Sequence, residues 1–212
     1  MNSPSDLIVE THPLGPLETN AYLVFEPKSR EMLVIDPGDE DDRFVGAIQA
    51  RLPSKVTVVL THGHIDHIGG VEQMRRVFKA EVWCGEDDAE MLVNPKANLS
   101  VFFGAPFATG KADRLLQEGD IVPVGNVQAS VVHLPGHTPG GIGLVFPDLV
   151  LSGDVLFAGG VGRSDFPGGD HVVLIDMITS KLLPLGSRRV LPGHGPETRL
   201  DIEARSNPFL NE

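Results

Sequence analysis

Four side chains of the kinds that bind metal ions occur within six residues of the sequence. His62, His64, Asp66 and His67 come directly after the apolar run 56–60, and a glycine separates the first two histidines. Alternate residues of an extended segment share a side, so His62 and His64 can both reach one ion at about 2.0 to 2.1 Å. Asp66 and His67 then turn towards a neighbouring position as the chain enters a helix. This spacing predicts a metal site at the end of a strand.

Three more ligand-type side chains follow apolar runs later in the sequence. They are His137 in Pro-Gly-His-Thr-Pro-Gly, Asp154 in Ser-Gly-Asp and His194 in Pro-Gly-His-Gly. Five imidazoles and two carboxylates exceed what one tetrahedral ion takes, but they divide between two ions about 3.5 to 4 Å apart. We therefore expect a site for two divalent metal ions. Because no cysteine is among the ligands, zinc is our first choice, with iron or manganese as alternatives.

A site of this kind hydrolyses acyl compounds without a side-chain nucleophile. Two divalent ions that share a water lower its pKa from 15.7 to about 7, and the resulting metal-bridging hydroxide can attack a carbonyl carbon that a metal polarises. Asp66 would orient this water and accept its proton, which makes it our candidate catalytic residue. A thiolate of pKa about 8.5 leaves without a strong acid. The site therefore suits a thioester, while other esters and lactones stay open.

The remaining candidates for chemistry have simpler interpretations. Cys84 follows an apolar run and has no neighbours that would activate it, so we expect a buried packing residue. Asp36, which precedes Pro-Gly, either accepts a hydrogen bond from a ligating imidazole or caps a turn. His133 is expected to support the site or the fold rather than to bind metal. His12 and His171 are expected at the surface or in packing.

Taken in order, the seven ligand positions resemble those of the metallo-β-lactamase superfamily. The Thr-His-x-His-x-Asp-His segment, Pro-Gly-His-Thr, Ser-Gly-Asp and Gly-His match its motifs over nearly the whole chain. The resemblance implies an α/β (α+β) protein, an αββα sandwich of two mixed β-sheets flanked by helices. It also implies one metal bound by His62, His64 and His137, a second bound by Asp66, His67 and His194, and Asp154 bridging both.

Within the superfamily, three segments resemble the glyoxalase II-like (hydroxyacylglutathione hydrolase-like) branch. They are residues 153–166, 19–22 and 207–210. This branch hydrolyses thioesters such as S-lactoylglutathione, so the resemblance implies a small-molecule thioester substrate. Arg163 stands where full-length glyoxalase II carries a basic residue that holds the glutathione carboxylate. An ion pair with Asp165 is the alternative interpretation of this arginine.

The match is closest to the short, single-domain members of this branch. Full-length glyoxalase II has an additional helical domain. It also has tyrosines near its site, whereas Asp165 and residues 195–197 occupy the stretches that correspond to those tyrosines here. A length of 212 residues lies between one and two domains of about 150 residues. We therefore treat residues 1–212 as a single metallo-β-lactamase-like domain.

Functions of other classes remain as alternatives. A persulfide dioxygenase of the same superfamily would use one iron at the positions of His62, His64, His137 and Asp154. A non-enzymatic metal-binding module is less favoured, because no ligand position that a two-metal hydrolase requires is missing. β-Lactam hydrolysis is not expected, because the sequence shows no secretion signal.

The composition of the chain limits its partners and its compartment. Seventeen Lys and Arg against 29 Asp and Glu give a net charge of −12, which argues against nucleic acid, RNA cleavage and an anionic membrane surface. One cysteine cannot form an intramolecular disulfide, and no apolar run approaches the roughly 18 residues of a membrane helix. Residues 1–6 do not begin a signal peptide. We expect a soluble cytoplasmic protein, and the sequence leaves its oligomeric state open.

The elements that must position the ligands alternate between strands and helices. β-Branched and apolar runs predict strands at 7–9, 21–25, 32–35, 56–60, 81–83, 121–124, 127–133, 142–146, 149–151 and 189–191. Apolar periodicity predicts helices at 44–52, 71–78, 86–93 and 171–183. Two similar halves of this kind predict two packed sheets with helices outside.

Three segments carry more detailed expectations. The acidic run 39–42 is interpreted as a helix start rather than a calcium site. Asp170 is expected to cap the last predicted helix. The apolar face of that helix is predicted to contain Val172, Ile175, Ile178 and Leu182. Residues 94–111 show no clear period and are expected to form a long surface connection or a lid.

Overall fold

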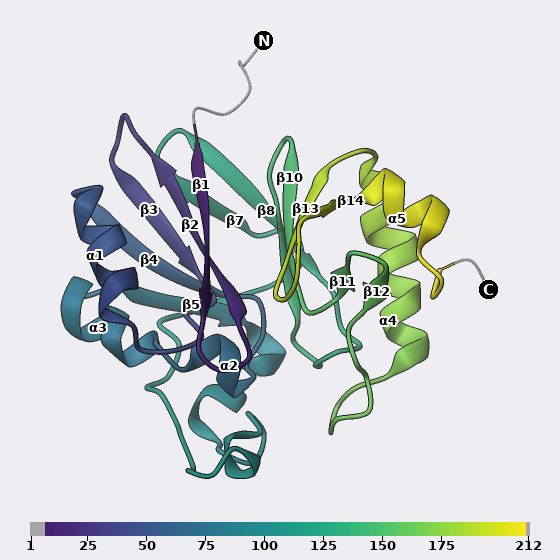
Figure 1. Cartoon of the computed structure of the whole chain (residues 1–212), viewed down its shortest axis with the longest axis horizontal. Helices are drawn as coiled ribbons and strands as arrows, with labels where there is room; N and C mark the ends of the chain where they lie inside the picture. Colours follow the sequence, from purple (N-terminus) through teal and green to yellow (C-terminus); the bar gives the residue numbers. More distant parts are fainter. Residues whose placement is uncertain (1–6, 211–212) are drawn as a thin grey trace.

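The structure is a computed structural model that describes residues 7–210 of the chain. Within these residues the strands form two six-stranded sheets and one two-stranded sheet. Helices cover the outer faces of the two larger sheets, which lie against each other in the middle of the molecule (Figure 1). The predicted αββα sandwich is confirmed. The prediction about residues 1–6 falls outside the described residues.

The first sheet follows chain order. Its first three strands are antiparallel, and β3 to β6 run parallel to one another. The strands are β1 (Ile8–Leu14), β2 (Thr19–Glu26), β3 (Glu31–Ile35), β4 (Lys55–Leu60), β5 (Glu81–Gly85) and β6 (Arg114–Leu116). The sequence predicted all of them except β6, which is too short to show an alternating pattern.

Helices α1 (Asp42–Ala50) and α3 (Val71–Phe78) cover the outer face of this sheet. The predicted start of α1 is confirmed, because the Asp41 carboxylate accepts hydrogen bonds from two backbone N–H groups of the first turn. Between β4 and α3 lies one turn of helix, α2 (Ile65–Ile68), which the sequence did not show. This short helix carries two of the predicted ligands, Asp66 and His67.

The second sheet contains the strands of the second half of the chain. In this sheet β10 and β13 run parallel to each other, and all other pairs of neighbouring strands are antiparallel. In sheet order the strands are β14 (Thr198–Arg199), β13 (Arg189–Pro192), β10 (Leu149–Gly153), β9 (Ile142–Val145), β8 (Val127–His133) and β7 (Ile121–Val124). The two-stranded sheet, which the sequence did not predict, pairs β11 (Leu156–Phe157) with β12 (Gly160–Val161).

The outer face of the second sheet is covered by α4 (His171–Met177) and by α5 (Leu200–Ser206), which was not predicted. A π-helical turn, η4 (Ile178–Leu182), and a 3₁₀ turn, η5 (Leu183–Leu185), continue α4 to near its predicted end. Asp170 caps α4 as expected. The predicted apolar face of this helix was wrong at Val172, which is 78% exposed, whereas Leu174 is fully buried. The buried row has a four-residue spacing at positions 174, 178 and 182.

The helix predicted at 86–93 was also wrong. This segment forms two separate 3₁₀ turns, η1 (Glu86–Asp88) and η2 (Met91–Val93). The reason lies in Asp88, whose carboxylate is turned inward to accept hydrogen bonds from other loops. Residues 94–111 do form a surface connection, with one 3₁₀ turn, η3 (Ser100–Phe102).

The central strands are buried on both faces. On β4, Val58 and Leu60 pack towards α1 and α3, while Val59 packs towards the second sheet. A strand with an apolar environment on each side lacks a polar face, which explains why the run 56–60 shows no alternation. Within residues 7–210, no helix combines the length and apolar composition needed to cross a bilayer.

The two sheets meet at the edge where their parallel strands end. Backbone hydrogen bonds join them there, from Ile142 N to Thr61 O at 2.8 Å and from Asn20 N to Gly193 O at 2.8 Å. Loops at the carboxyl ends of parallel strands are the usual place for ligand sites in α/β sheets. The predicted ligands follow β4, β10 and β13, so this edge is where they converge.

The packing of α4 gives a stability prediction. Leu174→Ala should lower the free energy of unfolding by about 2 to 5 kcal/mol, because it leaves a cavity under a fully buried side chain. Val172→Ala, two residues away and exposed, is the matched control and should change it by less than about 0.5 kcal/mol. Urea unfolding followed by circular dichroism measures both. Equal effects would contradict the assigned helix face.

Candidate metal centre

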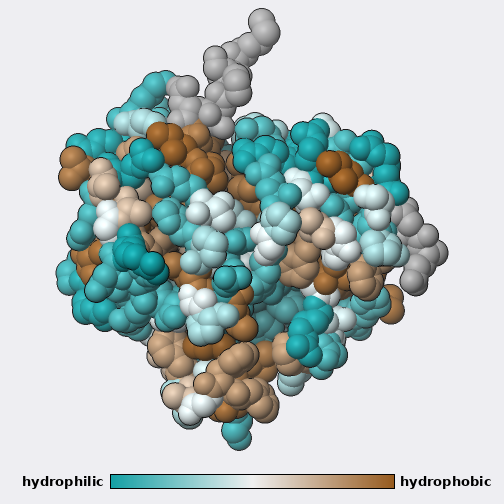
Figure 2. All heavy atoms as spheres, viewed as in Figure 1, coloured by the Kyte–Doolittle hydropathy of each residue, from teal (hydrophilic) through white to brown (hydrophobic). Residues whose placement is uncertain are grey.

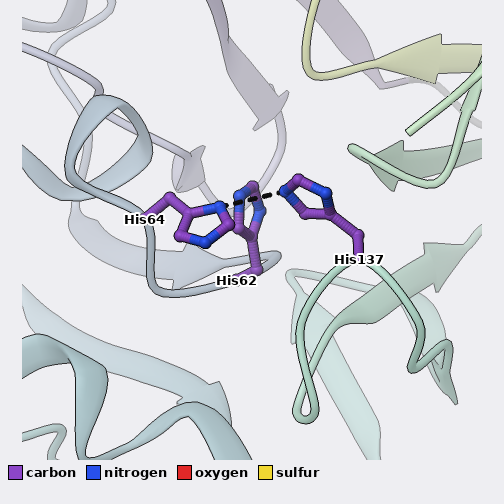
Figure 3. Close-up of side chains that lie close together, drawn as sticks. All are labelled: His62, His64 and His137. Atoms are coloured by element: carbon purple, nitrogen blue, oxygen red, sulfur yellow. Dashed lines mark hydrogen bonds between the residues drawn. The ribbon is translucent and has the colours of Figure 1, made fainter. Parts of the chain in front are cut away.

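Three histidines from two opposing loops form the first ligand group. His62 and His64 follow β4, and His137 lies on the loop between β8 and β9. Their nearest ring nitrogens lie within 4.8 Å of one another, and His64 Nδ1 is 3.0 Å from His137 Nε2. Figure 3 shows His137 reaching the other two imidazoles from the opposite side. All three side chains are buried.

A second group lies beside the first. Asp66 and His67 come from α2, and His194 comes from the loop after β13. Their ligand atoms also lie within 4.8 Å of one another. His194 Nε2 is 3.2 Å and His67 Nε2 is 3.6 Å from Asp66 Oδ2. The structure therefore brings six of the seven predicted ligands into two compact groups, divided as the resemblance implied.

Asp154, the seventh residue, lies between the two groups. Its Oδ2 is 3.7 Å from His137 Nε2 and 3.5 Å from His194 Nε2, and its Oδ1 is 3.4 Å from His67 Nε2. Gly193 makes this approach possible, because a Cβ at that position would lie 2.1 Å from Asp154 Oδ1. The carboxylate thus faces both groups, which is the geometry expected of a bridging ligand.

Hydrogen bonds at the outer nitrogen turn four of the imidazoles towards the centre. His67 Nδ1 donates to Asp36 Oδ2 at 2.9 Å. His137 Nδ1 donates to Arg163 O at 2.6 Å, and His194 Nδ1 donates to Leu17 O at 3.2 Å. His62 Nδ1 lies 3.2 Å from the Thr61 hydroxyl. A proton on each Nδ1 leaves the Nε2 lone pair free for a cation.

Asp36 supports the site through strained backbone. Its φ of +48° lies in the left-handed region, which a residue with a Cβ adopts only where its surroundings demand it. The carboxylate accepts hydrogen bonds from Thr61 N at 2.7 Å and from the Thr61 hydroxyl at 2.6 Å, besides the bond from His67. The expected hydrogen bond to an imidazole is therefore present. Because both oxygens are engaged, Asp36 supports His67 rather than joining the ligand set.

Burial and neighbouring charges shift the pKa values of the histidines in this site in opposite directions. Burial, together with neighbouring imidazoles, lowers the pKa of His62 and brings that of His64 to about 3, so both are neutral. Burial would also lower the pKa of His67, but the carboxylates of Asp154, Asp66 and Asp36 raise it above its ordinary value. The pKa of His194 is likewise raised, because Asp66 and Asp154 outweigh its burial.

The two inner carboxylates are ionised. Burial favours their neutral form, but the nearby imidazoles of His67 and His194 hold the pKa of Asp66 and of Asp154 below the ordinary value. In a site without metal, the protons of His67 and His194 supply the positive charge that these carboxylates require. A divalent cation would supply the same charge and displace those protons.

Several buried atoms fit a metal ion. Within the described residues 7–210, five buried side-chain atoms have no hydrogen-bond partner, and three of them are His62 Nε2, His67 Nε2 and Asp154 Oδ1. Such an atom costs about 1 to 3 kcal/mol unless something pairs with it. All three belong to the converging groups, and imidazole and carboxylate are the donors that zinc, iron and manganese accept. The donor set therefore fits divalent metal.

Comparison with known proteins gives the family. The model of the metallo-beta-lactamase superfamily matches residues 14–194. The chain belongs to this superfamily. It is 37% identical over 208 residues to the hydroxyacylglutathione hydrolase GloC of Haemophilus influenzae, an alignment that covers 96% of this chain and 98% of that protein.

Two solved structures are also similar to this chain over their whole length. The B3 metallo-beta-lactamase BLEG-1 has a TM-score of 0.92 and 36% identity, covering 97% of this chain and all of that one. TTHA1623, solved in a di-iron-bound form, has a TM-score of 0.81 and 38% identity, covering 95% of this chain and all of that one. The metallo-β-lactamase fold expected from the sequence is thereby shown.

Asp88 is a supporting residue that the sequence did not indicate. It is fully buried, and its carboxylate accepts hydrogen bonds from Gly63 N at 3.0 Å, from Thr138 Oγ1 at 2.8 Å and from Gly140 N at 2.6 Å. Gly63 separates the first two histidines, and the other partners follow His137. One carboxylate therefore ties together both loops of the first ligand group. Burial raises the pKa of Asp88, although these hydrogen bonds oppose the shift.

The segment 19–22 supports the second ligand group from the neighbouring sheet. The Thr19 hydroxyl donates to Asp66 Oδ2 at 3.1 Å. Asn20 Nδ2 donates to Pro192 O at 3.0 Å and to Gly195 O at 2.8 Å, and the Tyr22 hydroxyl donates to Pro192 O at 2.7 Å. The bonds from Asn20 and Tyr22 fix the loop that carries His194.

Arg163 forms the ion pair that was the alternative interpretation of this residue. Its guanidinium donates to the Asp165 carboxylate at 2.8 and 2.7 Å, and its Cζ lies 3.9 Å from the centre of the Phe166 ring. The side chain is 57% exposed and lies on the wall of the site cavity. The ion pair is therefore present, and a role in substrate binding stays a prediction.

The other residues singled out from the sequence lie outside the ligand groups. Cys84 is fully buried in β5, and burial raises the pKa of its thiol to about 12, which confirms a packing role. His133 bonds the Pro139 carbonyl at 2.9 Å and so supports the His137 loop. His12 packs on Phe44, and His171 is the exposed first residue of α4.

Replacing Asp88 should loosen the first ligand group. Asp88→Ala leaves three buried donors without an acceptor, so we expect the free energy of unfolding to fall by about 3 kcal/mol or more. Metal affinity should fall by roughly 10- to 100-fold, the usual effect of losing a partner behind the ligands. Asp87→Ala, adjacent and largely exposed, is the matched control. Metal titration by calorimetry that gives equal affinities for the two variants would contradict this role.

Metal binding should weaken as the pH falls, in two stages. An ion at Asp66, His67 and His194 displaces protons held by imidazoles whose pKa is raised, whereas His62 and His64 are already neutral. Ions should therefore leave the second group first. Elemental analysis after equilibration at a series of pH values measures this order, and His194→Ala should remove the early stage. Simultaneous loss of both ions in the parent protein would refute the assignment.

Proposed function

We propose that this protein hydrolyses small-molecule thioesters, such as S-lactoylglutathione, with two divalent metal ions, zinc in the first place and iron or manganese as alternatives. The single observation that carries the proposal is the placement of Asp154 between two complete ligand groups on the wall of an open cavity. Similarity to the hydroxyacylglutathione hydrolase GloC over nearly the whole chain supports the substrate class.

Seven side chains would hold the ions. His62, His64 and His137 would bind one, Asp66, His67 and His194 the other, and Asp154 both. When bound, divalent ions lower the pKa of a shared water towards neutrality and polarise a carbonyl oxygen. The ionised Asp66 carboxylate lies on the cavity wall, where it can orient the water by accepting its hydrogen bond.

The cavity over the site has a volume of about 480 Å³, within the range of small-molecule sites. Its walls are largely apolar side chains from four parts of the chain, namely Leu17, Ile65, Leu99, Phe103, Phe157, Val161 and Phe166. These side chains displace bulk water around the reacting carbonyl, which strengthens the electrostatic interactions within the site. The thiolate product needs no strong acid, because a simple thiol has a pKa of about 8.5.

Among the described residues, no side-chain nucleophile competes with a bound water. Cys84 does not line the cavity and is buried with a pKa of about 12. The second ligand group, complete in Asp66, His67 and His194, favours a two-metal hydrolase over the alternative, a persulfide dioxygenase with a single iron at the first group and Asp154. We also propose that the partners of this protein are small thioesters rather than nucleic acids or membranes, in keeping with its net charge of −12.

Asp154→Ala should reduce kcat/KM for S-lactoylglutathione by roughly 100-fold or more, because metal assistance contributes several kcal/mol. Asp176→Ala, exposed on α4, is the control and should retain the parent activity. The assay follows thioester absorbance with metal-loaded protein, and elemental analysis counts ions per chain. A metal-loaded Asp154→Ala variant that matches the parent would overturn the mechanism.

The same protein is tested on a chromogenic β-lactam, because BLEG-1 is a metallo-beta-lactamase, and on glutathione persulfide with an oxygen electrode. We expect thioester hydrolysis with two ions per chain. One iron per chain with oxygen consumption would replace the proposed function by the dioxygenase, and faster turnover of the β-lactam would replace it by a lactamase.

A further inference from the structure

A second cavity adjoins the one that contains the ligand groups. It has a volume of about 460 Å³ and is enclosed by the turn between β1 and β2, the loop after β3, α2 and residues 103–107. The two cavities share four wall residues, namely Leu17, Ile65, Asp66 and Phe103. Apart from Asp66, none of the seven ligand residues lines the second cavity. It therefore extends the site beyond the ligands.

The walls of the second cavity are mostly carbon. Leu14, Pro16, Ala105 and Phe107 contribute to it in addition to the shared apolar residues. Its charged wall residues are acidic, and Glu40 is paired with Arg76 at 3.1 Å. No lysine or arginine of the described residues lines it. Such a cavity favours an uncharged hydrocarbon chain and disfavours a carboxylate or phosphate.

Phe103 stands where the two cavities meet, on a segment whose base is fixed. Asn98 Nδ2 donates to Phe107 O at 2.9 Å, and Phe107 N donates to the Ser100 hydroxyl at 2.9 Å. Between these points the tip is exposed, with Phe102 at 75% and Phe103 at 60%. Figure 2 shows apolar side chains gathered over this projection at the bottom of the view. An apolar wall is therefore held in place beside the site.

The two cavities differ in charge, because only the first has an arginine in its wall. Arg163 lines only the first cavity, where it lies over Phe166. A polar thiol group would meet this arginine, while the acyl group would point past Leu17 and Ile65. We propose that the second cavity is the binding site for the acyl chain and that the enzyme selects thioesters of apolar acyl groups. This inference rests on the proposed thioester hydrolase function.

The test is a series of N-acetylcysteamine thioesters with acetyl, butyryl, hexanoyl and octanoyl groups. kcat/KM should rise roughly fourfold per methylene, the fold-change that corresponds to about 0.8 kcal/mol per buried methylene, until the cavity is filled. Succinyl thioester should react more slowly than butyryl thioester, because its carboxylate meets Asp39 and Glu40. A flat series would overturn the acyl site while leaving the proposed function in place.

One variant fills the second cavity without touching the ligands. Ala105→Trp should cancel the gain for hexanoyl and octanoyl thioesters and leave the acetyl thioester unchanged. Ala108→Trp, exposed on the same segment but on neither cavity wall, is the matched control and should behave like the parent. Equal losses for acetyl and octanoyl thioesters in Ala105→Trp would contradict the proposal.

Binding of unreactive analogues separates this inference from the proposed function. In the amide analogues a nitrogen replaces the thioester sulfur, so calorimetry measures Kd without turnover. The octanoyl amide should bind more tightly than the acetyl amide to the parent protein, and Ala105→Trp should remove the difference. If no thioester is hydrolysed but the difference in Kd is present, the proposed function fails and the apolar site stands. Equal Kd values for the two amides in the parent overturn the site.

Discussion

Ionised carboxylates and imidazoles are crowded together at one edge of this protein, largely out of water. Burial alone would favour the neutral form of each of these groups. Some of their inner atoms also have no hydrogen-bond partner within residues 7–210. The carboxylates of this group require positive charge nearby, and in a site without metal the protons of His67 and His194 supply it. The fit of this site to a divalent cation thus follows from the charges that the fold brings together at this edge.

The fold can impose this crowding because both sheets end at the same edge and are bonded to each other there. Hydrogen bonds from Tyr22 and Asn20 reach across to the loop of His194, and Ile142 reaches across to Thr61. Asp88 fastens the two histidine loops of the first group from behind. At this edge, the cavity whose wall includes the predicted metal-ligand residues adjoins the second, apolar cavity. The hydrogen-bonded edge therefore holds the ligand groups in place, and the surface segments around it form the walls of both cavities.

The sequence pointed to the seven side chains that the structure places together at one edge, because the signal was local. The ligands stand in glycine-containing turns at strand ends, and these turns are short enough to show both the side chains and the strand before them. Asp88 escaped notice because its partners are 25, 50 and 52 residues away, so its own neighbourhood suggested only an acidic helix. The face of α4 was misplaced for a similar reason, since Val172 and Leu174 are equally apolar in type and only packing distinguishes them. The second cavity is formed by four segments that are far apart in the sequence. No single segment shows a pattern that would predict the cavity.

The burial of Cys84 affects how the protein behaves towards sulfur chemistry. Its thiol is inaccessible and far from ionisation at neutral pH, and the chain has no other cysteine. In the folded protein this thiol neither exchanges with disulfides nor becomes acylated by an activated ester. A thiol released by the proposed reaction would therefore meet no accessible cysteine on this protein.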